Sequence, residues 1–281
     1  MEILNNLDPN TQLQRYIDFS KFVDLLDTQT IFLSRVSYFE DQLEGGLTPT
    51  FIMLSNGIAN LLSQVVNSMP LAQPTPEEKT EQQDKKETLQ TEYETRTYNT
   101  AFGKFPHSEV EYEKVFKQHR HWVDVNCWHA NKSESMAMWK IYGGSTNSVC
   151  IITNVNKLAS SVSASDKKLV LSKVHYINHE EDNFQEYHSL APLLHKSEFY
   201  SFENEVRLLA YNPEDDLLSE RSKSDAGTIL NVRLNDLIDE VRVAHNAPEW
   251  FYKLVQSVAI KYGVSANVVR SKMHQSPVYT L

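Results

Sequence analysis

The chain has 281 residues, 41% of them hydrophobic and 10% aromatic, which is enough for a substantial core, and its net charge is −10. The acidic balance disfavours non-specific nucleic-acid binding, and two cysteines are too few for a disulfide scaffold in a chain of this length. No secretory signal is seen and no segment is apolar enough for a membrane, so we expect a cytoplasmic protein.

The N-terminal part predicts a strand or loop, then a helix, then a strand. Asp18 or Ser20 can cap a short helix that runs to Leu26, and the apolar residues 31–33 predict a strand. An amphipathic helix is expected from Phe51 to Met69, because apolar residues recur there at helical spacing.

Residues 74–92 contain a single apolar side chain, Leu89, among Pro, Thr, Glu, Gln, Asp and Lys. Such a segment cannot bury enough surface to offset the entropy of ordering it. We therefore expect a charged insert at about 70–105, either a mobile loop or a solvated helix, within one domain that spans residues 1–281.

The rest of the chain mixes short apolar segments with helices. A helix is predicted after the insert at 109–120, and another from Ser133, its cap, to Ile141 before two glycines. The last long helix is expected from Pro248 to about Tyr262. Because strands and helices mix without strict β-α-β alternation, the pattern favours an α+β fold. Strands are predicted at 125–128, 149–152, 168–177, 206–211, 228–234 and 241–244.

The segment from Ser197 to Leu209 carries the most informative chemistry. It is predicted to be a helix end followed by a strand, on which alternation would place Glu203, Glu205 and Arg207 on one face. Paired carboxylates on a rigid strand beside aromatic rings can stabilise a cationic transition state. The same pattern is also typical of an ordinary solvated face of a sheet.

Two further segments hold candidate residues, each with a structural alternative. Arg15 beside Tyr16 can clamp a phosphate or a carboxylate, although such arginines more often form surface salt bridges. Trp139 and Tyr142 lie one helical turn apart, and Tyr142 can project into a cleft, although such a stripe is more often core.

A metal site would have to use His119, His121, Cys127 and His129. Their spacing matches none of the usual zinc patterns, so we expect no metal there. Serine-hydrolase elbows and glycine-rich phosphate loops are not found in the sequence, and the chain has only eight glycines. These observations argue against the common phosphate-cradling and serine-hydrolase folds.

Several motifs taken together resemble a widespread bacterial family of unknown function, marked by Met-Trp-x-x-Tyr and Glu-x-Glu-x-Arg. The resemblance covers most of the chain outside the insert, with glutamine at position 42 where the family normally has proline. That family in turn distantly resembles the ADP-ribosyltransferase superfamily, whose enzymes cleave the nicotinamide–ribose bond of NAD and transfer ADP-ribose. The segments that match the first of these families include Phe39-Glu40-Asp41-Gln42-Leu43-Glu44-Gly45, Met138-Trp139-Lys140-Ile141-Tyr142 and Glu203-Asn204-Glu205-Val206-Arg207.

The second resemblance implies a split antiparallel sheet flanked by helices, with NAD as substrate and an active-site order of Arg15, Tyr142 and Glu205. By analogy, Glu205 would hydrogen-bond the ribose, Tyr142 would stack on nicotinamide and Glu203 would orient the acceptor. The residues that bind NAD would be Arg15, Tyr16, Trp139 and Arg207.

Three functions are therefore considered. The first is an NAD-consuming ADP-ribosyltransferase or NAD glycohydrolase, such as a toxin-like or phage-defence effector, with a macromolecular acceptor that the sequence does not identify. The second is a catalytically inactive nucleotide- or protein-binding module of the same fold. The third is a metal-dependent nuclease or phosphatase, whose magnesium ligands would be Glu40, Asp41, Glu44, Glu203 and Glu205.

Overall fold

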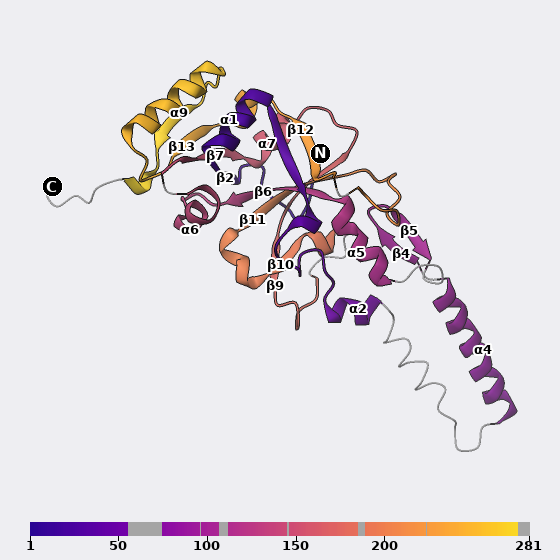
Figure 1. The fold of residues 1–281 in the computed structure, drawn as a ribbon. Coiled ribbons are helices and arrows are strands. Elements are labelled where there is room, and N and C mark those ends of the chain that lie inside the picture. Colours follow the sequence, from indigo (N-terminus) through magenta and orange to yellow (C-terminus); the bar gives the residue numbers. More distant parts are fainter. Residues whose placement is uncertain are drawn as a thin grey trace.

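The computed structural model describes residues 1–55, 75–95, 97–106, 112–144, 146–184, 189–222 and 224–274. An extended sheet runs through the molecule, with helices on its faces and at its ends (Figure 1). This is the α+β arrangement that the sequence predicts. None of the helices within these ranges is long and apolar enough to cross a membrane.

The main sheet has ten strands. Two of its strand pairs, β1–β8 and β13–β14, are parallel and the others are antiparallel, so the sheet is mixed rather than wholly antiparallel. β3 (Thr30–Arg35) pairs with β6, and β12 (Gly227–Asn231) pairs with β3. The order along the main path is β1 (Glu2–Ile3), β8 (Lys168–Lys173), β11 (Glu205–Tyr211), β6 (Asp124–Ala130), β2 (Gln12–Asp18), β7 (Ser148–Asn154), β13 (Glu240–Val243) and β14 (Asn267–Arg270).

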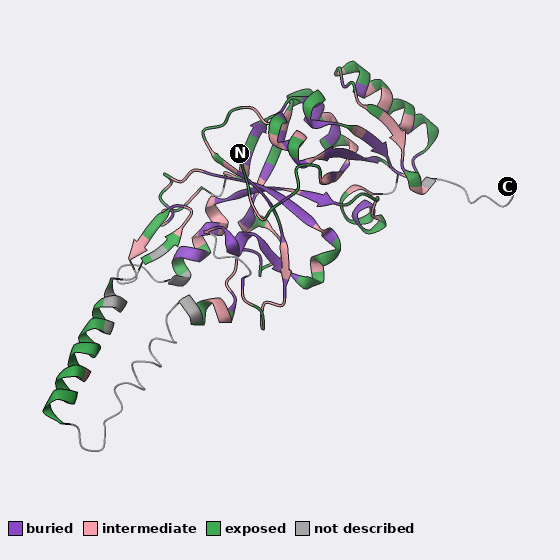
Figure 2. Ribbon diagram, turned by 180° about the vertical axis from the view of Figure 1, so that it is seen from behind, coloured by how far each residue is buried: buried purple, intermediate pink, exposed green. Residues whose placement is uncertain are grey.

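The two faces of the sheet form separate cores because successive residues of a strand point in opposite directions. On β11, Val206 and Leu208 contribute to the larger core, whereas Leu209 and Tyr211 contribute to the smaller one. Buried strands therefore occupy the centre of the molecule, as Figure 2 shows. The larger core is completed by α1 (Phe19–Thr28), α7 (Val155–Ser161), α8 (Leu234–Leu237) and α9 (Glu249–Lys261), and the smaller one by α5 (Tyr112–Trp122).

Local sequence signals place several helix ends correctly. The Asp18 carboxylate accepts a hydrogen bond from the Lys21 amide at 2.8 Å and caps α1, which confirms one of the two predicted caps. The proline at 248 stands immediately before α9, and the strands predicted at 125–128, 149–152 and 206–211 lie within β6, β7 and β11.

The helix predicted from Ser133 to Ile141 is much shorter in the structure. α6 spans Met136–Met138 and is capped by Ser135 rather than Ser133; it continues as a π-helical turn, η2 (Trp139–Gly143). Gly144 ends this turn with φ +83°, a conformation that favours glycine. Because a π-turn is wider than an α-turn, η2 presents Tyr142 differently from a regular helix.

Two predicted strands also divide. Residues 168–177 form β8 and then β9 (His175–Ile177), which pairs with β10 (His195–Ser197) in a separate two-stranded sheet. Residues 228–234 form most of β12 and the first residue of α8. Local pattern does not register these breaks, because the residues on both sides of each break have similar hydrophobicity.

The predicted insert contains an exposed helix. α2 (Pro49–Ser55) begins the helix expected at 51–69, whose remainder lies outside the described residues. α4 (Pro76–Glu94) projects away from the main sheet (Figures 1 and 2) and is followed by the hairpin of β4 (Thr97–Thr100) and β5 (Gly103–Pro106). The described part of the insert is therefore an exposed helix followed by a hairpin, and the hairpin was not predicted from the sequence.

Candidate functional site

Three carboxylates meet at the start of β11, one of them from a distant part of the chain. Glu44 comes from the turn that follows the 3₁₀ helix η1 (Val36–Tyr38). Glu203 ends a second 3₁₀ helix, η4 (Glu198–Glu203), and Glu205 is the first residue of β11. All three are buried, between 1% and 5% exposed. Acidic residues are seldom buried to this degree unless charged partners accompany them.

Glu203 does not lie on the strand, contrary to the sequence prediction. Asn204 adopts a left-handed conformation, with φ +39°, between η4 and β11 and interrupts the strand alternation there. Only Glu205 and Arg207 share a strand face, and Glu203 reaches the same place from the end of a helix. The alternative of a solvated sheet face is also wrong, since Arg207 is 0% exposed.

Two cations hold the three acids. Arg207 binds Glu205 in a bidentate manner, with N–O distances of 2.7 and 3.0 Å, and reaches Glu44 at 2.8 Å. The ammonium group of Lys196, on β10, lies 2.7 Å from Glu203, 2.9 Å from Glu44 and 3.6 Å from Glu205. These five residues are called the Glu205 cluster. Three negative charges against two positive ones leave the cluster with one negative charge in excess.

Opposite charges in the cluster favour the ionised forms of Glu205 and Lys196 over the effect of burial. Burial by itself would raise the pKa of Glu205, but the charge and hydrogen bonds of Arg207, followed by the charge of Lys196, lower that pKa to about 2. Burial would likewise lower the pKa of Lys196, but the charges of Glu205 and Glu44 raise it above its ordinary value. Glu205 and Lys196 therefore stay ionised across the neutral range.

Tyr142 connects the cluster to solvent. Its hydroxyl donates a hydrogen bond to Glu203 Oε1 at 2.6 Å, while the residue as a whole remains 46% exposed. Burial of the hydroxyl, together with the carboxylate beside it, raises the pKa of Tyr142, so the group stays protonated and acts as a donor. Of the three acids, Glu203 is the one that contacts a half-exposed side chain.

Aromatic side chains surround this contact. The Lys196 ammonium lies 4.6 Å from the centroid of the Tyr200 ring, and the Tyr176 hydroxyl accepts a hydrogen bond from the Glu205 amide at 2.8 Å. Residues three apart in a 3₁₀ helix share a face, so Tyr200 lies on the Glu203 face of η4, with Phe199 and Phe202 on another. Those two phenylalanines are exposed, so the face of η4 that turns away from Glu203 is apolar and open to solvent.

β6 supplies the floor of the site. Cys127 and His129 are the register partners of Arg207 and Glu205. Burial raises the pKa of the Cys127 thiol, so it is not a reactive thiolate. His129 Nδ1 is hydrogen-bonded to the Glu203 carbonyl oxygen and fixes the end of η4 against the sheet. The floor is therefore structural and neutral.

The structure does not bring Arg15 to Glu205. Gln14 pairs with His129, the partner of Glu205, so Gln14 shares the Glu205 face and the next residue, Arg15, points to the opposite face. The Arg15 guanidinium donates to the Cys127 carbonyl oxygen at 3.2 Å and lies 5.7 Å from the Trp128 ring centroid. The predicted order Arg15, Tyr142, Glu205 is therefore not gathered into one constellation here.

Tyr16 and Trp139 are buried rings rather than lining residues. Their centroids lie 4.9 Å apart in an edge-to-face arrangement, and the Tyr16 hydroxyl donates to Gln14 and accepts from the Ser135 amide. Trp139 is the first residue of η2, so this packing fixes the π-turn against β2.

Sequence reasoning gave Glu44 no role in the NAD reaction and did not single out Lys196. Glu44 appeared only as one of several scattered acids, and Lys196 stands in an unremarkable segment before η4. In the described part of the chain, no group of three or more His, Cys, Asp and Glu is arranged to hold a metal. Glu44, Glu203 and Glu205 do come together, but the cations of Lys196 and Arg207 lie between them.

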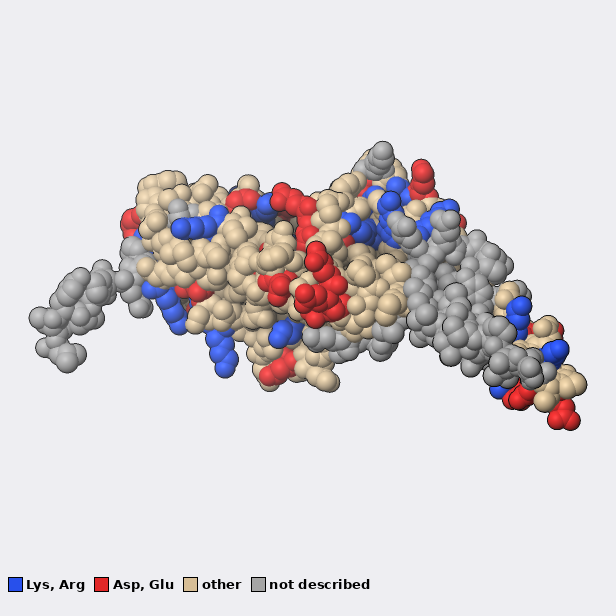
Figure 3. Space-filling view, turned by 90° about the horizontal axis from the view of Figure 1, so that it is seen from below, with Lys and Arg blue, Asp and Glu red and all other residues tan. Residues whose placement is uncertain are grey.

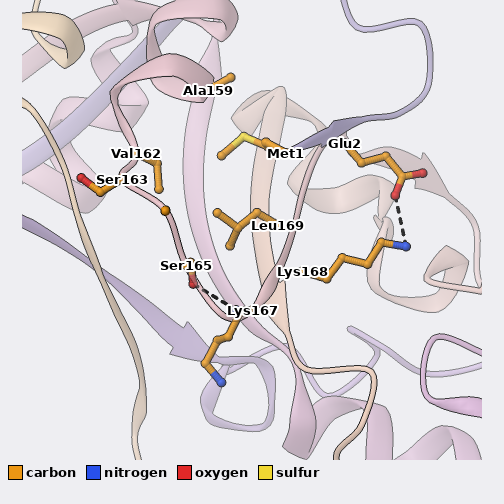
Figure 4. A pocket seen from close by; sticks show the side chains of 10 residues that line it. Met1, Glu2, Ala159, Val162, Ser163, Ser165, Lys167, Lys168 and Leu169 are labelled. Carbon is orange, nitrogen blue, oxygen red and sulfur yellow. Dashed lines mark hydrogen bonds and ion pairs between the residues drawn. The ribbon is translucent and has the colours of Figure 1, made fainter.

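A separate hollow of about 570 Å³ lies along β8 and the loop after α7 (Figure 4). Lys168 forms its wall with Met1, Glu2 and Leu169, and pairs with Glu2 at 3.2 Å. Lys168 is the register partner of Tyr211, at the far end of β11 and roughly 20 Å along the strand from Glu205. This hollow holds none of the clustered titratable groups, so the Glu205 cluster is the better candidate for chemistry.

No protein-family model matches the chain, and no curated protein matches its sequence. Among solved structures, the chain is similar to Thermus sp. 2.9 DarT in complex with ADP-ribosylated single-stranded DNA. The TM-score is 0.37 and the sequence identity 9%, over 97% of this chain and 98% of that one. A likeness of this degree does not establish a shared fold, and no residue of the site is assigned from it.

Proposed function

We propose that the chain cleaves the nicotinamide–ribose bond of NAD, as an ADP-ribosyltransferase or an NAD glycohydrolase. The supporting observation is the excess negative charge of the Glu205 cluster, whose buried member Glu203 accepts a hydrogen bond from the half-exposed Tyr142. Preorganised negative charge in a dry site favours a reaction whose transition state gains positive charge. The motif resemblance narrows this chemistry to NAD.

The reaction balances without a cofactor. The bond between ribose C1′ and the nicotinamide nitrogen breaks, and its electron pair leaves with nicotinamide, which becomes neutral. Positive charge then spreads over C1′ and the ring oxygen of the ribose, where a nearby carboxylate stabilises it. Water or an acceptor adds to C1′ and releases a proton, which Glu203 is placed to take.

The geometry divides the roles of the two acids. Glu203 contacts the exposed side of the site, so we assign it the contact with the ribose or the acceptor. Both oxygens of Glu205 are bound by Arg207, so we assign Glu205 an electrostatic role without direct contact with the substrate. Tyr142 offers a ring that can stack on nicotinamide. Arg15 has no place in this proposal because it lies on the opposite face of the sheet.

The acceptor is a separate question, and water is the simplest answer. One face of the molecule has acidic side chains gathered near its centre (Figure 3), which disfavours non-specific binding of a phosphate backbone to that face. We propose that ADP-ribose passes to water or to a macromolecular acceptor, and a toxin-like or phage-defence role would follow only from an identified acceptor.

The experiment measures nicotinamide released from NAD by the purified protein, alone, with cell lysate and with single-stranded DNA. Glu203→Gln and Glu205→Gln are each expected to lower turnover by roughly 100-fold or more, since each removes a charge that the transition state needs. Glu2→Gln is the matched control, because that exposed acid also pairs with a lysine. Unchanged turnover in Glu203→Gln would show that the site is not catalytic.

A second candidate is a binding module without catalysis. All six carboxylate oxygens of the cluster already have a cation or hydroxyl partner, as an inert structural cluster would. Calorimetric binding of NAD without release of nicotinamide, under every acceptor condition, would favour this candidate over the enzyme.

A further inference from the structure

Lys196 has a different role in the cluster from Arg207. Lys196 contacts Glu44, Glu203 and Glu205, whereas the described contacts of Arg207 to acids are to Glu44 and Glu205 alone. Arg207 also donates to the Leu193 carbonyl oxygen at 2.7 Å, which fixes it in the interior. Lys196 is therefore the cation that holds the acid nearest the exposed side.

The oxygens of Glu203 are shared between two donors of different kinds. Lys196 holds Oε2 at 2.7 Å from a buried position, and Tyr142 holds Oε1 at 2.6 Å from a half-exposed one. A substrate hydroxyl can replace the Tyr142 hydroxyl at Oε1 without disturbing Oε2. The Lys196 ammonium cannot easily leave, because it is surrounded by three acids and the Tyr200 ring.

We infer that Lys196 is a positioning residue for the cleavage reaction: it anchors Glu203 through Oε2 so that Oε1 faces Tyr142 and the incoming substrate. This inference rests on the proposed function. Lys196 is also the second positive charge that keeps Glu205 ionised, after Arg207. Among the described residues, the titratable and charged groups that face Lys196 are Glu44, Tyr142, Tyr176, Tyr200, Glu203, Glu205 and Arg207.

The test compares Lys196→Met and Lys196→Arg with wild type across pH. In Lys196→Met, kcat for nicotinamide release should fall roughly tenfold or more, with a change in KM of less than about threefold, because geometry rather than binding is lost. The acid limb of the kcat profile should move up by about one pH unit, since a positive neighbour of the carboxylates is gone. Lys196→Arg should restore part of kcat.

Lys168→Met is the matched control. Lys168 also pairs with a glutamate and lies over a tyrosine ring, at 5.9 Å, but it is exposed and at the far end of β11. This variant should leave kcat and the pH profile unchanged. A Lys196→Met protein that folds and keeps the wild-type acid limb and kcat would overturn the inference. If Lys196→Met does not fold, the same measurements are made on Lys196→Gln, in which unaltered kcat and acid limb would overturn the inference. In either neutral variant, a tenfold loss of kcat without a shift of the acid limb would limit the role of Lys196 to packing.

A second readout does not need turnover. The Glu205 carboxyl, whose pKa is about 2, can be followed by carbon NMR in side-chain-labelled protein, and its pKa should rise in Lys196→Met but not in Lys168→Met. If wild type releases no nicotinamide under any condition, the proposed function fails. The titration then decides separately whether Lys196 controls the carboxylates, and an unmoved Glu205 rejects that as well.

Discussion

Two of the ion networks among the described residues differ in their charge. The Glu205 cluster has three acids and two cations at the start of β11. At the other end of that strand pair, Asp124 of β6 is bound by Arg221 at 2.8 and 2.9 Å, and Arg221 and Arg35 both pair with Asp225. The second network, here called the Asp124 network, has two acids and two arginines and is electrically balanced.

The comparison separates a structural network from a candidate site. The Asp124 network fixes Arg221, Ser222 and Asp225 to the sheet, because Arg35 also donates to the Ser222 carbonyl oxygen. The Thr228 hydroxyl donates a further hydrogen bond to Asp124. Each of its charges has a fixed counterion, so nothing is left for a ligand. In the Glu205 cluster three acids share two cations, and Glu203, which pairs with Lys196, also accepts a hydrogen bond from the half-exposed Tyr142.

The largest effect is expected from removing the central cation of each network. Arg207→Met should destabilise folding by about 3–5 kcal/mol, because it leaves acids buried without their main partner, and should also abolish turnover. Arg221→Met should destabilise folding by less, since Asp225 is partly exposed, and should leave turnover per folded molecule unchanged. Urea unfolding with activity corrected for folded fraction measures both. Equal loss of turnover in the two variants would show that the Glu205 cluster is no more catalytic than the Asp124 network.

The pH dependence of stability separates the cluster from buried histidines. Burial lowers the pKa of His119 to about 4, and neither ring nitrogen has a hydrogen-bond partner among the described residues. The unfolded chain takes up this proton near pH 6.5, so stability should fall by about 3 kcal/mol between pH 6.5 and 4. The contribution of Glu205 is present above about pH 4.5 and is lost as pH falls toward 2.

His119→Phe should reduce the loss of unfolding free energy between pH 6.5 and 4, because a phenyl ring takes up no proton. The ring also suits the space beside Phe102 and Phe116. His121→Phe, two residues further along α5 and only partly buried, is the control and should keep most of the slope. Burial also lowers the pKa of His195 to about 4, so His195 should still contribute to the pH dependence of stability in both variants. Urea unfolding at pH 7 and pH 4.5 measures the difference; an unchanged slope in His119→Phe would contradict it.

The smallest effect on stability is expected at the exposed edge. Tyr142→Phe removes the hydrogen bond to Glu203 but keeps the ring, so unfolding free energy should change by less than about 1 kcal/mol. Turnover should fall roughly tenfold if the hydroxyl holds Glu203 for the reaction. Thermal unfolding and nicotinamide release measure the two quantities, and a large loss of stability would place Tyr142 with the structural network instead.

The sequence by itself determined the elements that depend on neighbouring residues. The Asp18 cap of α1, the apolar triplet in β3, the strands β6, β7 and β11, and the extent of α9 were all predictable from capping and hydrophobic periodicity. The same local reasoning singled out Glu203, Glu205 and Arg207, because three charges in five residues stand out beside an apolar strand. Capping, hydrophobic periodicity and the clustering of charges all depend on residues that are close in sequence, so they can be read before the fold is known.

The tertiary structure alone decided which charged groups meet and which do not. Arg207 binds Glu44, which lies 163 positions away in the sequence. Lys196 lies on β10, whose pairing with β9 cannot be predicted from the neighbouring residues. Arg15 was excluded by strand register, since one step along β2 moves a side chain to the other face. A charge can be buried only where counterions arrive, and their arrival depends on how the whole sheet packs rather than on the residues beside it in sequence.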